Sequence, residues 1–386
     1  MKTKPLAGIR VLELARILAG PWAGQLLADL GAEVIKVERP VEGDDTRHWG
    51  PPFLTDDAGL PRDAAYFHAA NRGKRSIAID LASPDGQAEV RALAARSDVV
   101  LENFKLGALA RYGLDHAALS AVNPRLVTCS ITGFGQTGPY AHRAGYDFII
   151  QAMAGAMSLT GEPDGPPEKA GVAYADIFTG LYAAVAILAA LRRRDATGQG
   201  AHIDMALMDA QVAVLANQAL NYMATGTAPT RMGNAHPNLV PYQSFRTADG
   251  DIIVAVGNDR QFAKLCAILG LDALAEDERF RSNAGRVTHR AELIPLLAEA
   301  IAVWPRATLA TRLEAEGVPG GPINPLDAVF ADPQVTARGL ALSLEGGLPG
   351  LACPIVIDGE RQNANRAAPR LDADGAAVRA ELKAGG

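Results

Sequence analysis

Short runs of Val, Ile and Leu recur along the N-terminal part of the chain, and they predict strands that are buried on both faces. The runs are nearly continuous rather than alternating with polar residues, which is typical of strands covered on both sides by helices. Helices are expected between them, for example at 20–31 and at 83–97, where Ser83 would cap the first turn. The alternation predicts an α/β fold with a parallel, doubly wound sheet. The predicted strands are 9–14, 32–38, 75–81, 98–103 and 125–132.

A long apolar helix is expected after residue 176, where the pattern changes. Residues 177–191 carry no charge, and three arginines followed by Gly198 then end the run. We take the run as too short for a comfortable membrane span. Residues 201–226 begin like a strand and continue as a second helix.

Two domains are expected, because 386 residues are more than one hydrophobic core usually serves. Residues 1–226 would form the larger domain, and 227–325 would form a polar linker and a smaller α+β domain. The smaller domain would open with a hairpin at the Asp-Gly pair 249–250. Residues 326–386 would rejoin the larger domain, with 351–360 as a candidate strand of the first sheet.

Composition and charge exclude several classes of protein. The net charge of −6 provides no excess of Lys and Arg for nonspecific binding to nucleic acid. Three scattered cysteines, with no Cys or His pair at ligand spacing, predict neither a metal site nor a disulfide framework. Arg10, Glu13 and Arg16 interrupt the apolar N-terminal stretch, which argues against a signal peptide. We therefore expect a soluble, cytoplasmic protein that does not act at a membrane.

The chain lacks the sequence motifs of several large enzyme classes. No G-x-G-x-x-G follows the first strand, and neither a Walker A loop nor a G-x-S-x-G elbow occurs. The Gly-rich stretch 132–138 could hold a phosphate with its backbone N–H groups, or it could simply be the turn that leaves the sheet. Six of the seven histidines are interpreted as surface or structural residues: His48, His68, His116, His142, His202 and His289.

Candidate anion-binding side chains follow successive predicted strands. Arg39 follows 32–38, and Asn103, Phe104 and Lys105 follow the strand that ends near 103, with Arg111 one to two helical turns later. Ligands of open parallel sheets bind outside the carboxyl ends of the strands. Arginine binds phosphate through forked hydrogen bonds, and a phenylalanine ring offers a flat face to a purine. Together these residues predict a site for an adenine nucleotide with several phosphates.

A single carboxylate, that of Asp176, stands at the head of the apolar helix. It could be the N-cap of this helix, because aspartate accepts hydrogen bonds from the free N–H groups of a first turn. It could also be a nucleophile in poorly solvated surroundings, with an oxyanion stabilised by the N–H groups of the helix start or by the loop 256–262. The local pattern leaves both interpretations open.

Several long stretches of the chain resemble class III coenzyme A transferases, also called the CaiB/BaiF family. They include "GIRVLELARILAGPWAGQLLADLGAEVIKVERP", "VVLENFKLGALARYGL", "SITGFGQTGPYAHRAGYDFIIQAMAG" and "AGVAYADIFTGLYAAVAILAAL", and the resemblance continues to "GVPGGPINPLDAVFADPQV". It implies a Rossmann-like large domain, a smaller domain, and a homodimer whose two subunits interlock like chain links. The implied substrates are an acyl-CoA thioester and a free carboxylic acid, with no permanently bound cofactor and no metal.

The resemblance also implies roles for individual residues. It makes Asp176 the nucleophile, which would form a mixed anhydride and then an aspartyl-CoA thioester. Some transferases carry Gln or His in the stretch where this chain has Arg16 and Leu18, so the local roles of these two residues stay open. The implied contacts with coenzyme A are Leu18, Ala19, Arg39, Asn103, Phe104, Lys105, Arg111, Gly145, Tyr146 and Asp147.

Within the family, residues 231–262 look most like transferases that move coenzyme A from succinyl-CoA to glutarate or a related dicarboxylate. Side chains that could hold the acid substrate are His236, Asn238, Arg260 and Gln261. The family also contains α-methylacyl-CoA racemases, in which a His stands where this chain has Tyr146, and a tyrosine phenol is poorly suited to accept a proton at neutral pH. A racemase is therefore less favoured than a CoA-transferase. It is kept as an alternative, together with a noncatalytic CoA-binding protein.

Overall fold

The structure, a computed structural model, describes residues 4–384 and divides them into two compact units. The larger unit contains 4–156, 169–227 and 333–384, and the smaller unit contains 157–168 and 228–332. Two segments that we assigned to the larger domain, 157–168 and 326–332, therefore group with the smaller one. The first does so because Gly161 O accepts the N–H of Gly233 at 3.0 Å and Arg231 donates to Gly165 O at 2.7 Å.

A six-stranded parallel sheet forms the centre of the larger unit, and this confirms the predicted fold class. All five predicted strands are present, and the sixth is the strand expected at the start of 201–226. The spatial order is β5 (Arg75–Ala78), β2 (Glu33–Glu38), β1 (Arg10–Glu13), β6 (Val99–Glu102), β7 (Val127–Thr132) and β8 (Ala201–Ala206).

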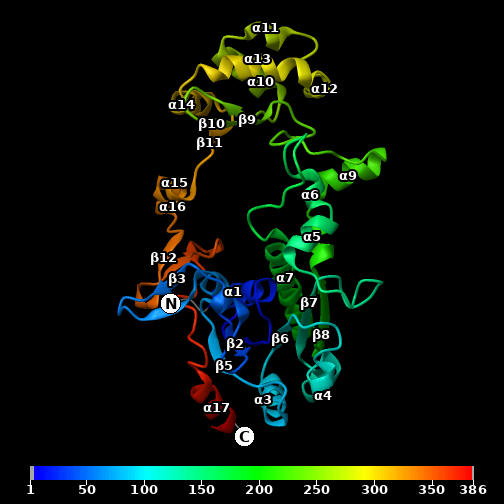
Figure 1. Cartoon of the computed structure of the whole chain (residues 1–386), viewed down its shortest axis with the longest axis vertical. Coiled ribbons are helices and arrows are strands. Elements are labelled where there is room, and N and C mark those ends of the chain that lie inside the picture. Colours follow the sequence, from blue (N-terminus) through cyan, green and yellow to red (C-terminus); the bar gives the residue numbers. More distant parts are fainter. Residues whose placement is uncertain (1–3, 385–386) are drawn as a thin grey trace. The chain divides into compact units, whose positions relative to one another are not determined.

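Helices cover both faces of this sheet (Figure 1). Along β1, Val11 packs into the cluster on one face and Leu12 into the cluster on the other, as expected when both faces are buried. One face carries α1 (Ala19–Asp29), α5 (Asp147–Met153), α7 (Tyr174–Thr197) and α8 (Leu207–Ala213). The other face carries α3 (Pro84–Ala95), α4 (His116–Val122) and α17 (Gly375–Ala384).

Helix α7 is longer than the apolar run that predicted it, with 24 residues. By length and composition alone it could cross a membrane, so our argument from a short run was wrong. Ala183, Ala184 and Ile187 on this helix are buried, as in a core helix of a globular domain. The second predicted helix is broken into α8 and α9 (Ala216–Thr225), and Ala216 at the break has a left-handed φ of +47°.

Residues 351–360 do not join the large sheet, contrary to our prediction. Strand β13 (Pro349–Leu351) pairs with β12 (Ala341–Ser343), and β14 (Val356–Ile357) pairs with β15 (Glu360–Arg361). The free edge of β5 is instead closed by carboxylates, because Asp374 accepts the N–H of Ser76 at 3.0 Å and Asp372 accepts that of Ala78 at 2.9 Å. Other elements of the larger unit are η1 (Asp45–His48), β3 (Phe53–Thr55), β4 (Pro61–Ala64), α2 (Ala65–Asn71), η2 (Ala110–Tyr112), α16 (Pro333–Ala337) and η3 (Glu345–Gly347).

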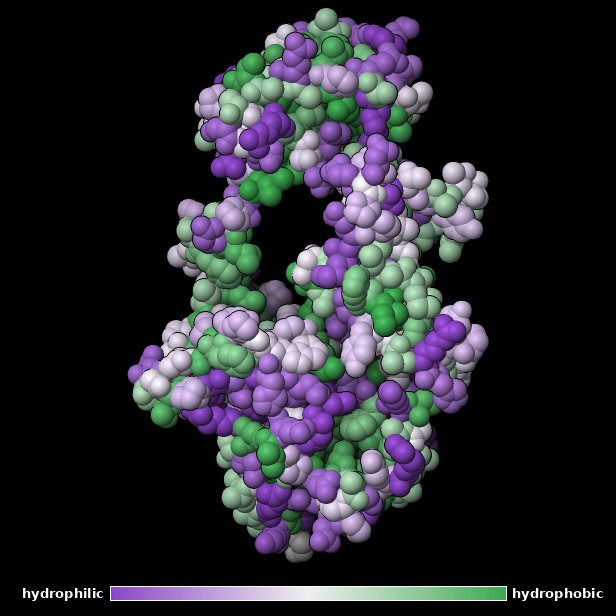
Figure 2. Space-filling model, viewed as in Figure 1, coloured by the Kyte–Doolittle hydropathy of each residue, from purple (hydrophilic) through white to green (hydrophobic). Residues whose placement is uncertain are grey.

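The smaller unit is α+β, as predicted. Its antiparallel sheet contains the expected hairpin, β9 (Tyr242–Arg246) and β10 (Asp251–Ala255), with β11 (Gly320–Pro322) at the other edge. Its visible surface mixes hydrophilic and apolar residues (Figure 2). Its helices are α10 (Asp259–Leu269), α11 (Asp272–Glu276), α12 (Asn283–Thr288), α13 (Arg290–Ala302), α14 (Arg306–Glu316) and α15 (Leu326–Ala331), and the short α6 (Ala156–Leu159) spans the division between the units.

Four charged side chains are fully buried where β1 and β2 end, and we call them the Glu13 cluster: Glu13, Lys36, Asp44 and Lys74. Lys36 Nζ lies 3.1 Å from Glu13 and 2.9 Å from Asp44, and Lys74 Nζ lies 2.8 Å from Glu13. Burial alone would lower the pKa of Lys36, but Asp44 and Glu13 together raise it. For Lys74 burial prevails and lowers the pKa to about 8. The cluster therefore depends on both carboxylates to keep two buried ammonium groups charged.

We expect Glu13→Gln to destabilise the larger unit by about 3–5 kcal/mol, because two buried ammonium groups lose the carboxylate that they share. Urea unfolding of the full chain, followed by fluorescence at pH 7, measures this loss. Glu42→Gln is the control, since Glu42 is 66% exposed in its pair with Arg39 and should lose less than about 1 kcal/mol. Equal losses in the two variants would contradict the prediction.

Candidate active site

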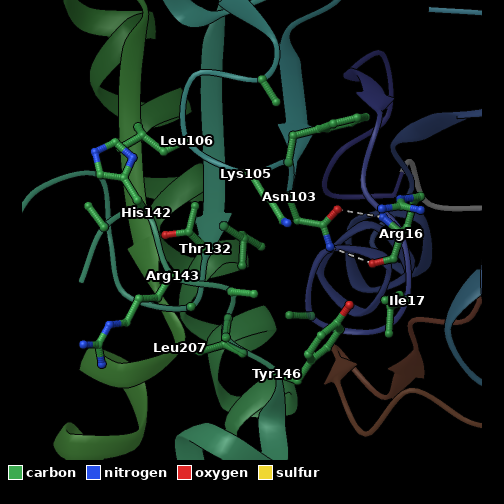
Figure 3. Close-up of a pocket in the computed structure, with 18 of the residues that line it drawn as sticks. Arg16, Ile17, Asn103, Lys105, Leu106, Thr132, His142, Arg143, Tyr146 and Leu207 are labelled. Carbon is green, nitrogen blue, oxygen red and sulfur yellow. Dashed lines mark hydrogen bonds between the residues drawn. The ribbon is translucent and has the colours of Figure 1, made fainter.

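A cavity of about 640 Å³ opens at the carboxyl ends of the central strands. The segments that follow β1, β6 and β7 line it, together with residues 141–146, Asp176 at the start of α7, and Leu207 (Figure 3). This is the edge at which open parallel sheets bind their ligands. Six of the ten predicted coenzyme A contacts come from these strand ends and line the cavity: Leu18, Ala19, Asn103, Phe104, Lys105 and Arg111.

The loop after β1 is held in a strained conformation by side chains from other elements. Ile17 has a left-handed φ of +71°, which is rare for a β-branched residue. Asp44 accepts its N–H at 3.2 Å, and Lys36 donates to Ala15 O at 2.8 Å. The side chain of Asn103 accepts the N–H of Arg16 at 2.9 Å and donates to its carbonyl at 2.7 Å (Figure 3). Asn103 therefore lines the cavity but uses its amide to hold the loop.

Three exposed cations line the cavity without a carboxylate partner. Lys105, Arg111 and Arg143 form no ion pair with any residue between 4 and 384. The guanidinium of Arg143 lies over the ring of Tyr140, 3.9 Å from its centre, which fixes its position without neutralising it. In Figure 3, Arg143 and Arg16 lie on opposite sides of the cavity. The wall is therefore positively charged and suited to phosphate groups.

Arg16 and Arg39 differ from these three cations, because they share a carboxylate. Asp45 lies 2.7 Å from Arg16 and 2.9 Å from Arg39, and Glu42 lies 3.3 Å from Arg39. Arg39 lines a separate small cavity that Phe104 shares with the large one. The guanidinium groups of Arg16 and of the predicted contact Arg39 are thus partly neutralised.

Two further residues of this cavity, His142 and Arg143, were not predicted as ligand contacts. They lie in a loop rather than directly after a strand, so the argument from strand ends did not reach them. Their signal in the sequence is the aromatic Tyr140 before them and Gly145 after them. A side-chain carbon at Gly145 would lie 2.6 Å from the Cα atom of Gly133, so two glycines are required where this loop crosses the end of β7.

The Gly-rich stretch after β7 forms a turn, and side chains of the fold accept two of its N–H groups. Gly135 donates its N–H to the hydroxyl of Thr132 at 2.9 Å, and Gln136 donates to Asp204 at 3.0 Å. These two N–H groups are not available to a phosphate, which favours the turn over the phosphate cradle.

Asp176 lies in the first turn of α7 and lines the cavity. It is not the N-cap, which is Ala173, so that interpretation was wrong. Burial, reinforced by the nearby carboxylate of Asp147, raises its pKa from 3.8 to about 7. It forms no ion pair with any residue that the structure describes. Asp176 is thus a poorly stabilised anion near neutral pH, which makes it more basic and a better nucleophile than an ordinary aspartate.

The last three predicted coenzyme A contacts are neighbours in the chain, but only two of them line the cavity. Gly145 and Tyr146 line the cavity, whereas Asp147 does not. The carboxylate of Asp147 accepts the N–H of Ala175 at 2.8 Å and that of Asp176 at 3.4 Å. It occupies the start of α7, so these two N–H groups are not available to an oxyanion, contrary to our expectation.

The four residues predicted to hold the acid substrate lie in the smaller unit and do not line this cavity. His236 Nδ1 accepts the N–H of Asn238 at 3.0 Å. Gln261 accepts the N–H of Gly257 at 2.8 Å, and Arg260 is exposed. Their role toward an acid substrate stays a prediction. Among residues 4–384, no group of His, Cys, Asp and Glu could hold a metal ion.

Known proteins match this chain over nearly its whole length. The family model described as CoA-transferase family III matches residues 6–375. Succinate–glutarate CoA-transferase of Agrobacterium fabrum is 56% identical over 383 residues, which are 98% of this chain and 96% of that protein. Human succinyl-CoA:glutarate CoA-transferase is 45% identical over 342 residues, which are 89% of this chain and 77% of that protein.

The fold matches solved structures equally well. The crystal structure of a CAIB/BAIF family protein from Brucella suis is 57% identical in sequence, with a TM-score of 0.88 over 99% of this chain and 100% of that one. The family model and these relatives agree with the resemblance seen in the motifs. The chain therefore belongs to CoA-transferase family III.

Proposed function

We propose that this CoA-transferase moves coenzyme A from succinyl-CoA to glutarate or a closely related dicarboxylate, through a covalent intermediate on Asp176. The observation that carries the proposal is the cavity in which an unpaired carboxylate faces the same space as three unpaired cations. The acids are taken from the names of the relatives that are 56% and 45% identical to this chain.

In this proposal, coenzyme A lies along the edge of the sheet. Lys105, Arg111 and Arg143 would bind its phosphate groups, since each is unpaired and faces the cavity. Phe104 would offer a flat face to the adenine, and it lies between the large cavity and the small one beside Arg39. The thioester would then reach Asp176.

The reaction proceeds by four substitutions at carbonyl carbon and needs neither ATP nor a cofactor. The Asp176 carboxylate attacks the succinyl thioester; the C–S bond breaks, which leaves a succinyl-aspartyl anhydride and coenzyme A thiolate. The thiolate attacks the aspartyl carbonyl and releases succinate, so that an aspartyl-CoA thioester remains. Glutarate attacks this thioester to form a second anhydride and thiolate. Attack of the thiolate on the glutaryl carbonyl releases glutaryl-CoA and restores Asp176.

Assembly and location are proposed from the family alone. We expect an interlocked homodimer in the cytoplasm. Size-exclusion chromatography with light scattering tests the assembly, and a mass of one chain would overturn it.

We expect the full chain to convert succinyl-CoA and glutarate into glutaryl-CoA, and Asp176→Asn to lower the rate by about 10³-fold or more, because it removes the nucleophile. Mass spectrometry of the acyl-CoA products measures both. Asp195→Asn is the matched control, since it changes an exposed aspartate on the same helix. Scrambling of a chiral α-methylacyl-CoA without transfer to any acid would favour the racemase instead.

Replacing Lys105, Arg111 or Arg143 by Met should raise the KM for succinyl-CoA by about 10-fold each, the loss expected for one charge-assisted hydrogen bond to phosphate. The KM for glutarate should change little. Arg125→Met is the control, since Arg125 is exposed and does not line the cavity. The same increase in both KM values would contradict the assignment of these cations to phosphate.

Asp176→Asn should also stabilise the protein, and more so at pH 8 than at pH 4. The pKa of Asp176 is about 7 in the folded chain, above its ordinary value of 3.8. The folded state therefore retains the proton longer, and stability falls as the pH rises from about 4 to about 7. We expect a gain of about 2 kcal/mol at pH 8, discounted because the carboxyl group is partly solvated. Urea unfolding at several pH values checks this, and a gain that does not depend on pH would contradict it.

A further inference from the structure

Two side chains of α5 hold the segment that leads into α7. Asp147 accepts the N–H groups of Ala175 and Asp176 at 2.8 and 3.4 Å through one oxygen, and the side-chain amide of Gln151 at 2.7 Å through the other. Gln151 is 2% exposed and accepts the N–H of Ala170 at 3.0 Å. Asp147 and Gln151 lie one helical turn apart, so they present a joint surface to the segment. This clamp fixes the first turn of α7, and with it the backbone of Asp176.

A carboxylate is an unusual choice for this clamp, because the residue that it positions is itself an aspartate. The first N–H groups of a helix normally stabilise a nearby anion. Here Asp147 takes these N–H groups for its own charge and adds a like charge close to Asp176. A neutral asparagine would accept the same N–H groups without that repulsion. The structure therefore combines good placement of Asp176 with poor stabilisation of its anion.

No cation between residues 4 and 384 forms an ion pair with Asp176 that would offset this repulsion. On α2, burial and the negative charge of Asp176 both raise the pKa of the Tyr66 phenol, which is not a cation. On the cavity wall, Lys105 and Arg16 face the same space as Asp176, but neither forms an ion pair with it. Among the residues that the structure describes, the carboxylate of Asp147 on α5 is the charge that adds to burial in raising the pKa of Asp176.

We infer that Asp147 is a positioning residue that aims Asp176 into the cavity and favours its acylated forms over the free carboxylate. The inference rests on Asp176 being the nucleophile, as proposed above. When Asp176 attacks a thioester carbonyl, its negative charge leaves with the departing thiolate, so the repulsion from Asp147 is relieved. The two backbone hydrogen bonds to Asp147 persist, because they involve N–H groups and not the reacting oxygens. Asp147 thereby destabilises the reactant and not the intermediate.

Asp147→Asn is the informative variant, because the asparagine oxygen can still accept the N–H groups of Ala175 and Asp176 while the charge is removed. The hydrogen bond from the Gln151 amide is lost with the second oxygen, and this loss removes no charge. The kcat/KM for succinyl-CoA should be measured from pH 5 to pH 9 at saturating glutarate. In the native enzyme it should rise with ionisation of Asp176, with a midpoint near the pKa of about 7. The variant should shift this midpoint down by about one pH unit, and its value above pH 8 should fall several-fold, since a less basic carboxylate is a weaker nucleophile.

A matched control separates charge from capping. Asp115 caps α4 by accepting the N–H of Ala118 at 3.3 Å, and it does not line the large cavity. Asp115→Asn makes the same chemical change at another helix start and should leave the midpoint unmoved. A purely structural role of Asp147 would lower the rate without moving the midpoint, and that result would overturn the inference.

A second measurement needs no substrate and therefore separates this inference from the proposed function. The gain in stability caused by Asp176→Asn should increase between pH 5 and pH 8, and this increase should be smaller when Asp147 is already Asn. Urea unfolding of the two single variants, the double variant and the native chain gives both increases. Equal increases in the two backgrounds would overturn the inference, whatever acids the enzyme uses. Failure to form glutaryl-CoA, with unequal increases, would instead overturn the choice of substrate.

Discussion

The arrangement of the active-site edge depends on the Glu13 cluster, the group of buried charges where β1 and β2 end. Lys36 connects the cluster to the loop, because its ammonium group binds Asp44 and the carbonyl of Ala15. Asp44 in turn accepts the N–H of Ile17. Buried ion pairs contribute little net stability, since desolvation offsets most of the attraction. Their effect here is to fix one conformation of the loop, including a left-handed isoleucine that would otherwise cost about 1–3 kcal/mol.

The charged side chains of this molecule fall into two groups: those that form ion pairs within the fold, and those at the cavity that have no partner of opposite charge. Asp44 is surrounded by donors, and although burial opposes its charge, Lys36 and backbone N–H groups lower its pKa to about 2. Asp176 is half-buried, and the charge that adds to this burial is the carboxylate of Asp147, so its pKa rises to about 7. The cations show the same division. Lys36 and Lys74 are paired inside the sheet, whereas Lys105 and Arg143 are unpaired at the cavity. The paired side chains stabilise the conformation of the fold, whereas the unpaired ones at the cavity are available to bind a substrate.

Sequence reasoning recovered what depends on local pattern and missed what depends on contacts between distant segments. Continuous apolar runs sufficed for the five strands, because burial on both faces leaves a clear pattern. Ser83 was correctly predicted as a helix cap, and it accepts the N–H of Gly86 at 3.0 Å, since capping acts within one turn. Asp176 was wrongly considered a cap for its own helix. The residue that holds that helix start is Asp147, which lies far away in the sequence, and no spacing rule connects the two.

The sequence sufficed to predict a binding site at the edge of the sheet. It did not reveal which side chains there face the cavity and which hold the backbone. Phe104, Lys105 and Arg111 follow a strand, and their place at the cavity could be inferred from that position. Asn103 stands beside them, yet its amide is occupied by the backbone of Arg16. Arg143 reaches the cavity from a loop, and its alignment over Tyr140 becomes visible only in three dimensions.

Close packing of α1 against α7 fixes the distance between the loop after β1 and Asp176. A side-chain carbon at Gly180 would lie 2.7 Å from the carbonyl oxygen of Ala19, so the two helices touch through backbone at this point. Ala19 is the first residue of α1, directly after the strained loop, and Gly180 lies one turn beyond Asp176 on α7. Ala19, Ala175 and Ile150 of α5 belong to one buried cluster. The loop after β1, Asp176 and the helix that carries Asp147 are therefore packed on the same core. Strain or repulsion at the cavity cannot relax by moving one of them alone.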